Sequence, residues 1–310
     1  MEYRSLGNTG LKVSSLSLGA SSLGGGVFRK VEEREAIRTV ETALGLGINF
    51  IDVSPFYGIT RAEVVLGKAL ANFSRDRYYL ATKVGRYGEN EFDFSKDRVA
   101  ASVDESLKRL GVEYLDILQA HDIEYGNLEQ VIEETLPALR RIQEQGKARF
   151  IGITGYPLHI FRYVLERAKI DTILSYNHYS LNDSTLVSLL PSLEERGVGV
   201  INASPLSQGL LSNRGTPVWH PASAEVKAIC ARAAAFCRER GSDLSKLAVQ
   251  FSVINPRIAT TLVGSADPAN VQKNVEWLDQ PLDSVLLQEV QRILRPIQDR
   301  AWIVGRAENN

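Results

Sequence analysis

Short apolar runs alternate with longer amphipathic stretches along almost the whole of this sequence. The apolar runs have the length and composition of strands, and the stretches that follow them show the spacing of amphipathic helices. Successive strands that are joined through helices run parallel, with right-handed crossovers. The pattern repeats eight times, which favours a closed (β/α)8 TIM barrel over an open sheet.

The predicted fold class is therefore α/β. An open doubly wound sheet would be expected to carry a G-x-G-x-x-G loop after its first strand, and the loop at residues 19–26 lacks that spacing. No linker divides the chain, so residues 1–310 are predicted to form one barrel domain. A β-hairpin is predicted at 1–13 and extra helices near the C-terminal end. The predicted strands span 15–18, 49–52, 79–83, 115–119, 150–154, 172–176, 198–203 and 260–263. The predicted helices span 32–46, 62–70, 95–110, 128–145, 158–168, 185–196, 224–240, 244–254, 269–278 and 284–295.

Charge and composition argue against several classes of partner. The net charge of −1 favours neither nucleic acid nor an anionic membrane. No apolar run approaches the roughly 20 residues of a membrane span, and the N-terminus lacks the apolar core of a signal peptide. Cys230 and Cys237 would lie roughly 10 Å apart on one helix, too far for a disulfide. We therefore expect a cytoplasmic protein that acts on a small molecule.

Four polar side chains are predicted to meet at one end of the barrel. Asp52 ends the second predicted strand, and Tyr57 follows it in a Ser-Pro-Phe-Tyr-Gly turn. Lys83 ends the third strand, and His121 follows the fourth. In a barrel of this kind the loops after the strands build the active site.

These four groups suit proton transfer to or from a carbonyl or alcohol. A phenol has a pKa near 10, and an ammonium such as that of Lys83 is expected to lower the pKa of Tyr57. Asp52 would keep Lys83 charged, while His121 would bind the substrate oxygen and help to move the proton. Tyr57 would then be the acid for reduction and the base for oxidation.

Each residue taken alone has an ordinary structural explanation. Asp52 could cap a helix, Tyr57 could pack in its loop, and His121 could be a satisfied core histidine. Lys83 is less easily explained, because a buried lysine is costly without a partner. Convergence of all four on one barrel face favours the catalytic interpretation.

The run Gly47-Ile-Asn-Phe-Ile-Asp52 with Tyr57-Gly58 resembles the signature of the aldo-keto reductases. The resemblance begins at Leu6 and extends to Asn274, nearly the whole chain. Within that family, several longer runs are similar to those of the plant-type L-galactose dehydrogenases. These runs are 81–87, 92–95, 121–124, 150–155, 182–186, 203–206 and 219–223.

The resemblance implies NAD-dependent oxidation of an aldose at its anomeric carbon, with L-galactose and its 1,4-lactone as the expected pair, as in ascorbate biosynthesis. It also implies a monomer. The alternatives are an L-fucose or D-arabinose dehydrogenase, an NADPH-dependent aldehyde or ketone reductase, and a non-enzymatic cofactor-binding regulatory subunit. No metal is expected, since the four histidines show no ligand spacing.

The resemblance also assigns cofactor contacts to loops after several strands. A loop with backbone amides and a small residue such as Gly209 suits a pyrophosphate. Ala266 stands where NADPH-using relatives carry a cation, and Asp267 would repel a 2′-phosphate, so NAD is expected over NADP. The nicotinamide contacts, Thr154 and Asn177, depart from the family pattern. The full set of expected cofactor contacts is Gly19, Ala20, Ser21, Thr154, Asn177, Ser204, Leu206, Gln208, Gly209, Gly264, Ser265, Asn270 and Asn274.

Substrate contacts are expected from loops, where polar groups suit sugar hydroxyls and an aromatic ring suits a sugar's apolar face. Phe28, Arg86, Asp122 and Trp219 are the candidates. Arg86 could instead be a solvated loop charge, and Trp219 could be a loop anchor packed on the barrel.

Overall fold

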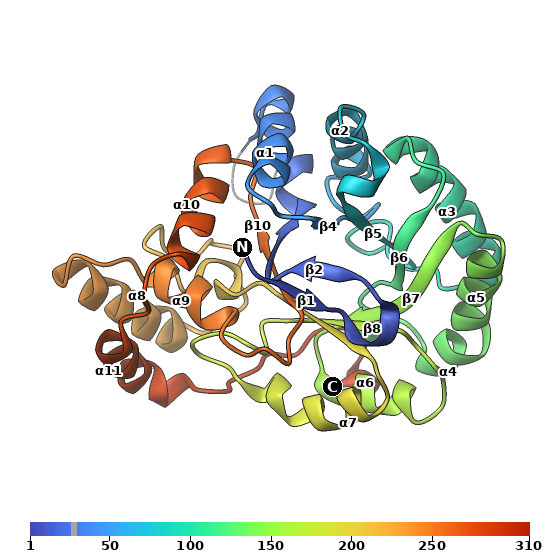
Figure 1. Cartoon of the computed structure of the whole chain (residues 1–310). Helices are drawn as coiled ribbons and strands as arrows, with labels where there is room; N and C mark the ends of the chain where they lie inside the picture. The colour runs from blue at the N-terminus through green and yellow to red at the C-terminus, as the bar shows by residue number, and fades with distance from the viewer. Residues whose placement is uncertain (26–29) are drawn as a thin grey trace.

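The computed structural model describes residues 1–25 and 30–310 and contains a closed barrel. Within the described residues, eight strands pair in the order β10-β3-β4-β5-β6-β7-β8-β9, every pair parallel (Figure 1). This arrangement confirms the predicted (β/α)8 fold class. The barrel strands are β3 (Leu16–Gly19), β4 (Phe50–Asp52), β5 (Tyr79–Val84), β6 (Leu115–Ala120), β7 (Ala148–Gly155), β8 (Thr172–Tyr176), β9 (Gly199–Ala203) and β10 (Thr260–Gly264).

An antiparallel hairpin, β1 (Tyr3–Ser5) and β2 (Lys12–Ser14), closes the N-terminal end of the barrel (Figure 1). Leu6 and Leu11 from the hairpin are buried in one cluster with Phe50, which lies on β4. The backbone N–H of Asn8 donates to the carbonyl of Gly197 at 2.8 Å, just before β9. The hairpin therefore plugs this end, and the opposite end carries the loops that can form a site.

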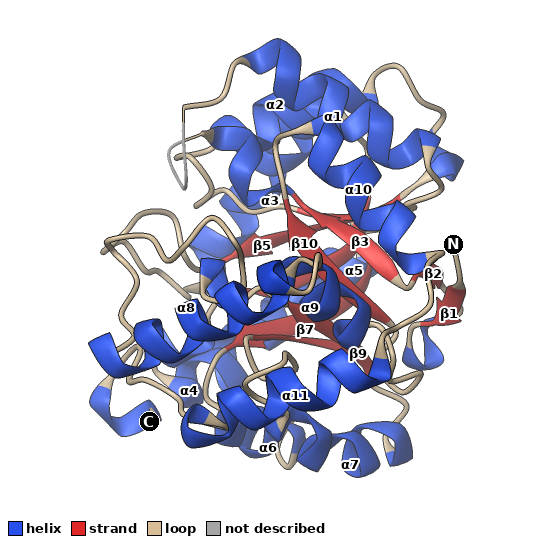
Figure 2. Ribbon diagram, turned by 90° about the vertical axis from the view of Figure 1, so that its left-hand side faces the viewer, coloured by secondary structure: helices blue, strands red, loops and turns tan. Residues whose placement is uncertain are grey.

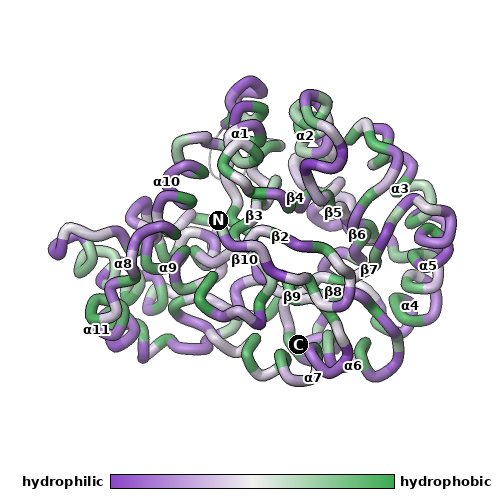
Figure 3. The backbone as a smooth tube through the Cα atoms, viewed as in Figure 1, coloured by the Kyte–Doolittle hydropathy of each residue, from purple (hydrophilic) through white to green (hydrophobic). Residues whose placement is uncertain are grey.

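Helices surround the strands as an outer layer (Figure 2). Their residues alternate between hydrophilic and hydrophobic (Figure 3), as expected for helices with one face on a sheet and one in solvent. The helices are α1 (Glu33–Gly45), α2 (Arg61–Leu70), α3 (Lys96–Leu110), α4 (Leu128–Gln130), α5 (Leu136–Glu144), α6 (Leu158–Leu165), α7 (Leu190–Glu195), α8 (Ala224–Glu239), α9 (Leu244–Ser252), α10 (Pro268–Leu278) and α11 (Ser284–Leu294).

Prolines explain two departures from the predicted helices. The helix predicted at 128–145 contains a π-helical turn, Val131–Thr135, between α4 and α5. Pro137 lacks the N–H that would bond four residues back, and its ring would crowd that carbonyl, so the backbone widens there. The segment predicted at 185–196 starts as a 3₁₀ helix, Thr185–Leu189, before α7, in which Pro191 lies in the first turn.

The extra helices α8, α9 and α11 share a separate apolar cluster, which includes both cysteines. Cys230 and Cys237 are buried and unbridged, as predicted. Burial raises the pKa of Cys230 to about 12 and that of Cys237 to about 11, so both thiols stay protonated. Among the described residues, no helix is long and apolar enough to cross a membrane.

Gly67 tests how tightly the outer layer packs. A Cβ at Gly67, in the middle of α2, would lie 2.4 Å from the backbone oxygen of Arg109 in α3. Gly67→Ala is therefore expected to lower the free energy of unfolding by about 1–3 kcal/mol, although alanine is the better helix former. Gly45→Ala is the matched control, because Gly45 is helical and a Cβ there would meet nothing within 4 Å. Chemical denaturation of both variants checks this, and equal effects would contradict the packing argument.

Candidate active site

The four predicted residues lie together at the C-terminal end of the barrel strands. Asp52 is the last residue of β4, Lys83 lies on β5, and His121 directly follows β6. Tyr57 comes from the loop after β4. Parallel strands in one barrel end at the same face, so three neighbouring strands place these side chains in contact.

Lys83 and Asp52 form a buried ion pair, and their side chains are 1% and 3% exposed. The ammonium also donates to the carbonyl of Val53 at 2.8 Å, and the Gln119 amide donates to the second oxygen of Asp52 at 2.9 Å. Burial opposes the charge on Lys83, but the attractions of Asp52 and Tyr57 and the hydrogen bonds to them together outweigh burial and raise the pKa of Lys83. Lys83 is therefore an ammonium at neutral pH.

Tyr57 contacts the free side of this ammonium. Nζ of Lys83 lies 3.3 Å from the phenol oxygen and 4.8 Å from the ring centroid. Burial raises the pKa of Tyr57, and the charge of Lys83 acts in the opposite direction. Lys83 therefore has the effect on this pKa that the sequence predicts, but the effect of burial is larger. Lys83 limits the rise rather than bringing the pKa of Tyr57 below its ordinary value.

Two glycines allow the tyrosine loop to pack against the loop after β3. Gly58 has a φ of +61°, and a Cβ there would lie 2.7 Å from Cα of Gly24. A Cβ on Gly24 would lie 2.9 Å from Cα of Gly58. Backbone meets backbone at this point, so a larger residue at either position would displace the loop that carries Tyr57.

His121 faces Tyr57 edge to face, with ring centroids 5.7 Å apart. Its Nδ1 lies 2.9 Å from the hydroxyl oxygen of Ser54. Burial lowers the pKa of His121 to about 3, so the imidazole is neutral at physiological pH. Ser54 and Gln119 were missed as site residues. Gln119 carries a signal, since it is the last residue of the predicted strand 115–119. Ser54 lies in the loop after β4, where strand alternation does not apply.

Arg86 and Asp122 extend the site behind His121. Nη1 of Arg86 donates to Oδ2 of Asp122 at 2.6 Å, and the guanidinium lies 3.9 Å from the ring centroid of Phe56. Thr154 donates its hydroxyl to Oδ1 of Asp122 at 3.1 Å and accepts the Asp122 backbone N–H at 2.8 Å. Arg86 is therefore not a solvated loop charge. The hydroxyl of Thr154 was expected to bind the nicotinamide carboxamide. In the structure it hydrogen-bonds to Asp122.

The other two candidate substrate contacts are Trp219 and Phe28. Trp219 is 53% exposed and contacts the ring of His220. His220 is itself buried, with Nε2 3.2 Å from the carbonyl oxygen of Ser207. Phe28 lies outside the described residues.

The residues predicted to hold the cofactor occupy the neighbouring arc of the barrel. Except for Thr154, which lies on β7, they lie at or beyond the C-terminal ends of β8, β9, β10 and β3, which are consecutive in the closed sheet. The tetrad of Asp52, Tyr57, Lys83 and His121 comes from β4, β5, β6 and the loops after them. Gly19 pairs with Gly264 across β3 and β10, and a Cβ at Gly264 would lie 3.4 Å from Oγ of Ser21. Ala20 lies in the short helix after β3, and Ser265, Asn270 and Asn274 lie in and beyond the loop after β10.

Two features of this arc fit a nicotinamide dinucleotide. Asn177, after β8, is 3% exposed, and neither polar atom of its amide has a hydrogen-bond partner among the described residues. A carboxamide needs one donor and one acceptor, which this side chain offers. After β9, the backbone of Ser204, Ser207, Gln208 and Gly209 has φ between +46° and +105°. Such turns can form concave sites for anions such as a pyrophosphate.

A segment near the C-terminal end holds the loop that follows His121. The amide of Asn309 donates to the carbonyls of Glu124 and Gly126, both at 2.9 Å. The backbone N–H of Arg306 also donates to the Glu124 carbonyl, at 3.0 Å. Gly305, with a φ of +77°, packs so closely that a Cβ would lie 2.4 Å from that oxygen.

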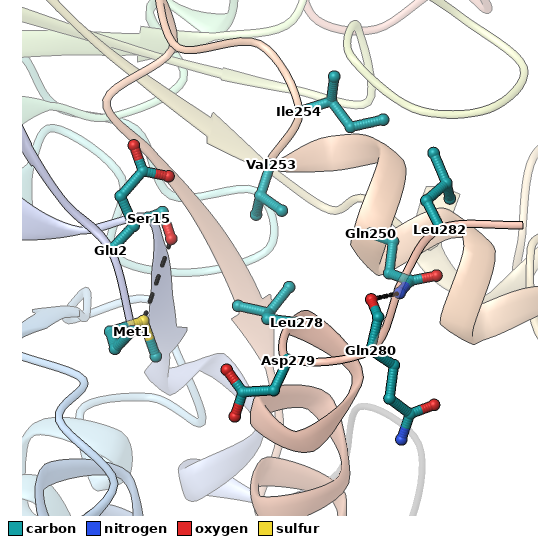
Figure 4. Close-up of a pocket in the computed structure, with 10 residues that line it drawn as sticks. All are labelled: Met1, Glu2, Ser15, Gln250, Val253, Ile254, Leu278, Asp279, Gln280 and Leu282. Carbon is teal, nitrogen blue, oxygen red and sulfur yellow. Dashed lines mark hydrogen bonds between the residues drawn. The ribbon is translucent and has the colours of Figure 1, made fainter. Parts of the chain in front are cut away.

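Other parts of the described structure offer no competing site of this kind. Among the described residues, no cluster of histidine, cysteine or carboxylate side chains could hold a metal ion. A pocket between Met1, Ser15, Gln250 and Leu278 lies at the N-terminal end of the strands, away from the tetrad (Figure 4). Its acidic and aliphatic lining brings together none of the predicted site residues.

Comparison with known proteins agrees with this geometry. The model of the Aldo/keto reductase family matches residues 15–295. The chain belongs to the aldo/keto reductase family. Aldo-keto reductases bind a nicotinamide cofactor, in line with the features of the arc after β8, β9, β10 and β3.

Individual aldo-keto reductases and related dehydrogenases match most of the chain. L-galactose dehydrogenase of Arabidopsis thaliana is 50% identical, and the match covers 100% of this chain and 99% of that protein. D-arabinose 1-dehydrogenase of Saccharomyces cerevisiae is 34% identical over 78% of each chain. The solved holo structure of an aldo-keto reductase from Bacillus halodurans has a TM-score of 0.79 at 29% identity, covering 97% of this chain and 98% of that one.

Gly305 tests whether the C-terminal segment holds the loop of His121. Gly305→Ala is expected to force this segment away from Glu124 and to speed amide hydrogen exchange in residues 121–126. Gly146→Ala is the matched control, because Gly146 has almost the same φ, +76°, but a Cβ there would meet nothing within 4 Å. Both variants carry the strain of a left-handed alanine, about 1 kcal/mol. Unchanged exchange in Gly305→Ala would contradict the proposed restraint.

Proposed function

We propose that this aldo-keto reductase oxidises an aldose at its anomeric carbon to the lactone, with NAD as the cofactor and L-galactose as the substrate. The observation that supports this most strongly is the contact of the Tyr57 phenol with the Lys83 ammonium beside a neutral His121. It occurs in a chain half identical, over its full length, to an L-galactose dehydrogenase. The product would be L-galactono-1,4-lactone.

In the proposed mechanism, each residue handles a proton or a charge. A bound nicotinamide supplies the acceptor for the hydride that leaves the anomeric carbon. Tyr57, as phenolate, takes the proton of the anomeric hydroxyl, and the ammonium of Lys83 stabilises that phenolate. Asp52 keeps the ammonium charged and directed at Tyr57, and His121 binds the reacting oxygen. In the opposite direction, Tyr57 returns the proton.

The proposed contacts with the cofactor divide among the four loops after β8, β9, β10 and β3. The amide of Asn177 would bind the nicotinamide carboxamide, with Thr154 nearby. The turn of Ser204, Leu206, Gln208 and Gly209 would hold the pyrophosphate. Gly264, Ser265, Asn270 and Asn274 would meet the adenosine end, and Gly19, Ala20 and Ser21 would line the adjoining edge.

We also propose that the enzyme works in the cytoplasm as a monomer, with residues 1–310 as one domain. The balanced charge and the two buried, unbridged cysteines support this setting. The similarity to a D-arabinose 1-dehydrogenase makes that pentose, together with L-fucose, the second candidate substrate. An NADPH-dependent reductase and a regulatory subunit remain as less favoured alternatives.

A panel of aldoses tests the proposal. The purified enzyme with NAD should reduce the cofactor fastest with L-galactose, read as the rise in absorbance of NADH. D-arabinose and L-fucose should follow, and D-galactose should be poor because its hydroxyls have mirror-image stereochemistry. Turnover of none of these sugars would overturn the proposed function.

Tyr57→Phe should abolish oxidation while NAD still binds. The change removes the proton acceptor and leaves the ring in place, so the loss in kcat should be at least about 100-fold. Tyr3→Phe, at the plugged end of the barrel, is the matched control and should keep full activity. Cofactor binding is measured by fluorescence titration. Substantial turnover by Tyr57→Phe would remove this residue from its assigned role.

Asp267 should disfavour NADP. Its side chain caps α10 by accepting the backbone N–H of Ala269 at 2.9 Å, so its charge lies beside the proposed adenosine site. Wild-type kcat/KM should be higher with NAD than with NADP. Asp267→Asn keeps the cap and removes the charge, so it should raise kcat/KM for NADP and leave the value for NAD nearly unchanged. A tenfold wild-type preference for NADP would refute the argument.

A further inference from the structure

We propose that Asp122, fixed by Arg86 and Thr154, is a positioning residue that holds His121 in the tautomer with its proton on Nε2. Ser54 completes the arrangement from the other side of the ring. The catalytic consequence rests on the proposed function, whereas the tautomer itself is a property of the free enzyme. This role differs from the sugar contact expected for Arg86 and Asp122.

The first step of the argument concerns the oxygens of Asp122. Oδ2 accepts from Nη1 of Arg86 at 2.6 Å and lies 3.5 Å from Nε2 of His121. Oδ1 accepts from the hydroxyl of Thr154. The carboxylate is therefore surrounded by donors, and its side chain is only 10% exposed. Few acceptor positions remain for a sugar hydroxyl.

The second step concerns its charge. Burial disfavours the charged form of Asp122. The attraction that a protonated His121 would exert, the attraction of Arg86 and the bonds from Arg86 and Thr154 together outweigh burial and lower its pKa. When His121 is neutral, the contacts that favour the ionised carboxylate are the ion pair with Arg86 at 2.6 Å and the hydroxyl of Thr154. The neighbouring carboxyl of Glu124 is buried, which raises its pKa well above the usual range.

The third step assigns the proton on the ring. An ionised carboxylate only accepts hydrogen bonds, so the nitrogen that faces Asp122 is the one that carries hydrogen. A neutral imidazole has one N–H, which leaves Nδ1 as an acceptor. Ser54 must then donate its hydroxyl to Nδ1, and its oxygen is held by the backbone N–H of Phe56 at 3.1 Å.

The consequence is a preset donor for the reacting oxygen. At 3.5 Å, Nε2 makes only a long contact with Oδ2 of Asp122, so its N–H can still donate to the oxygen of the anomeric carbon. The other tautomer would present a lone pair and repel that oxygen. The backbone at Asp122 has a φ of +49°, a conformation that aspartate and asparagine tolerate better than most residues. Position 122 thus combines an unusual backbone with the acceptor next to the histidine.

Nitrogen-15 NMR of protein labelled at histidine reads the tautomer directly, without any substrate. The chain has only four histidines, so the His121 signals can be assigned with a His121→Gln variant. In the wild type we expect a protonated Nε2 and a bare Nδ1, unchanged between pH 5 and 9. A bare Nε2 in the wild type would overturn the proposal, and no variant is needed for this result.

Two substitutions at Asp122 test whether its carboxylate acts as a hydrogen-bond acceptor for His121 or only fills space beside the ring. Asp122→Asn keeps an oxygen where Arg86 and Nε2 converge, so it should retain the wild-type tautomer. Asp122→Ala leaves Nε2 facing the donors of Arg86, so the proton should move to Nδ1 and toward the oxygen of Ser54. Wild-type signals in Asp122→Ala would overturn the proposal. Backbone strain at position 122 would not by itself shift the proton between the two nitrogens of His121, so it would not change the NMR signals.

Steady-state kinetics provide a second test of the role of Asp122. Asp122→Ala should lower kcat for aldose oxidation by at least roughly tenfold with little change in NAD binding, and Asp122→Asn should restore most of it. Asp116→Ala is the matched control. Asp116 is also buried, with 1% of its side chain exposed, and is paired with Arg75 at the same 2.6 Å, but it lies near the other end of β6. It should alter neither the tautomer nor kcat. Absence of aldose turnover would refute the proposed function and leave the tautomer result standing.

Discussion

The buried pair of Lys83 and Asp52 is the interaction on which the rest of the site depends. A lysine with 1% of its side chain exposed stays charged only because a carboxylate and a backbone carbonyl surround it. Gln119 satisfies the second oxygen of that carboxylate. This arrangement leaves one side of the ammonium directed at the phenol of Tyr57. The barrel makes it possible, because neighbouring parallel strands end at one face and bring the charged groups together there.

Around that pair the barrel separates two tasks. Strands β4, β5 and β6 supply the groups that move a proton, and the arc of β8, β9, β10 and β3 supplies loops that fit a dinucleotide. Charge within the proton-transfer part is balanced locally, because Lys83 faces Asp52 and Arg86 faces Asp122. Burial lowers the pKa of His121, so the imidazole between these pairs is neutral. The segment around Asn309 crosses to the loop after β6 and ties it down.

Much of this could be predicted from the sequence, for identifiable reasons. The period of the apolar runs determined the barrel, and residues at strand ends had to share one face, which brought Asp52, Lys83 and His121 together. Ser54 lies in a loop, whereas Gln119 was accessible to the same reasoning, because it ends the predicted strand 115–119. The roles of Arg86 and Thr154 were not, because they depend on which side chain each loop directs at Asp122. The contact of Gly305 with Glu124 likewise depends on long-range packing, which local patterns do not encode.

The pH dependence of hydride transfer tests most directly whether the buried pair tunes Tyr57. The double variant Asp52→Asn/Lys83→Met removes both charges together, so no uncompensated charge is left in the barrel. Lys83 lowers the pKa of Tyr57 more than Asp52 raises it. Aldose oxidation needs the phenolate, so its rate rises with pH through this pKa. The account predicts that the midpoint of the rise moves to higher pH in the double variant, measured in single turnovers with bound NAD. A midpoint that stays at the wild-type pH would contradict it.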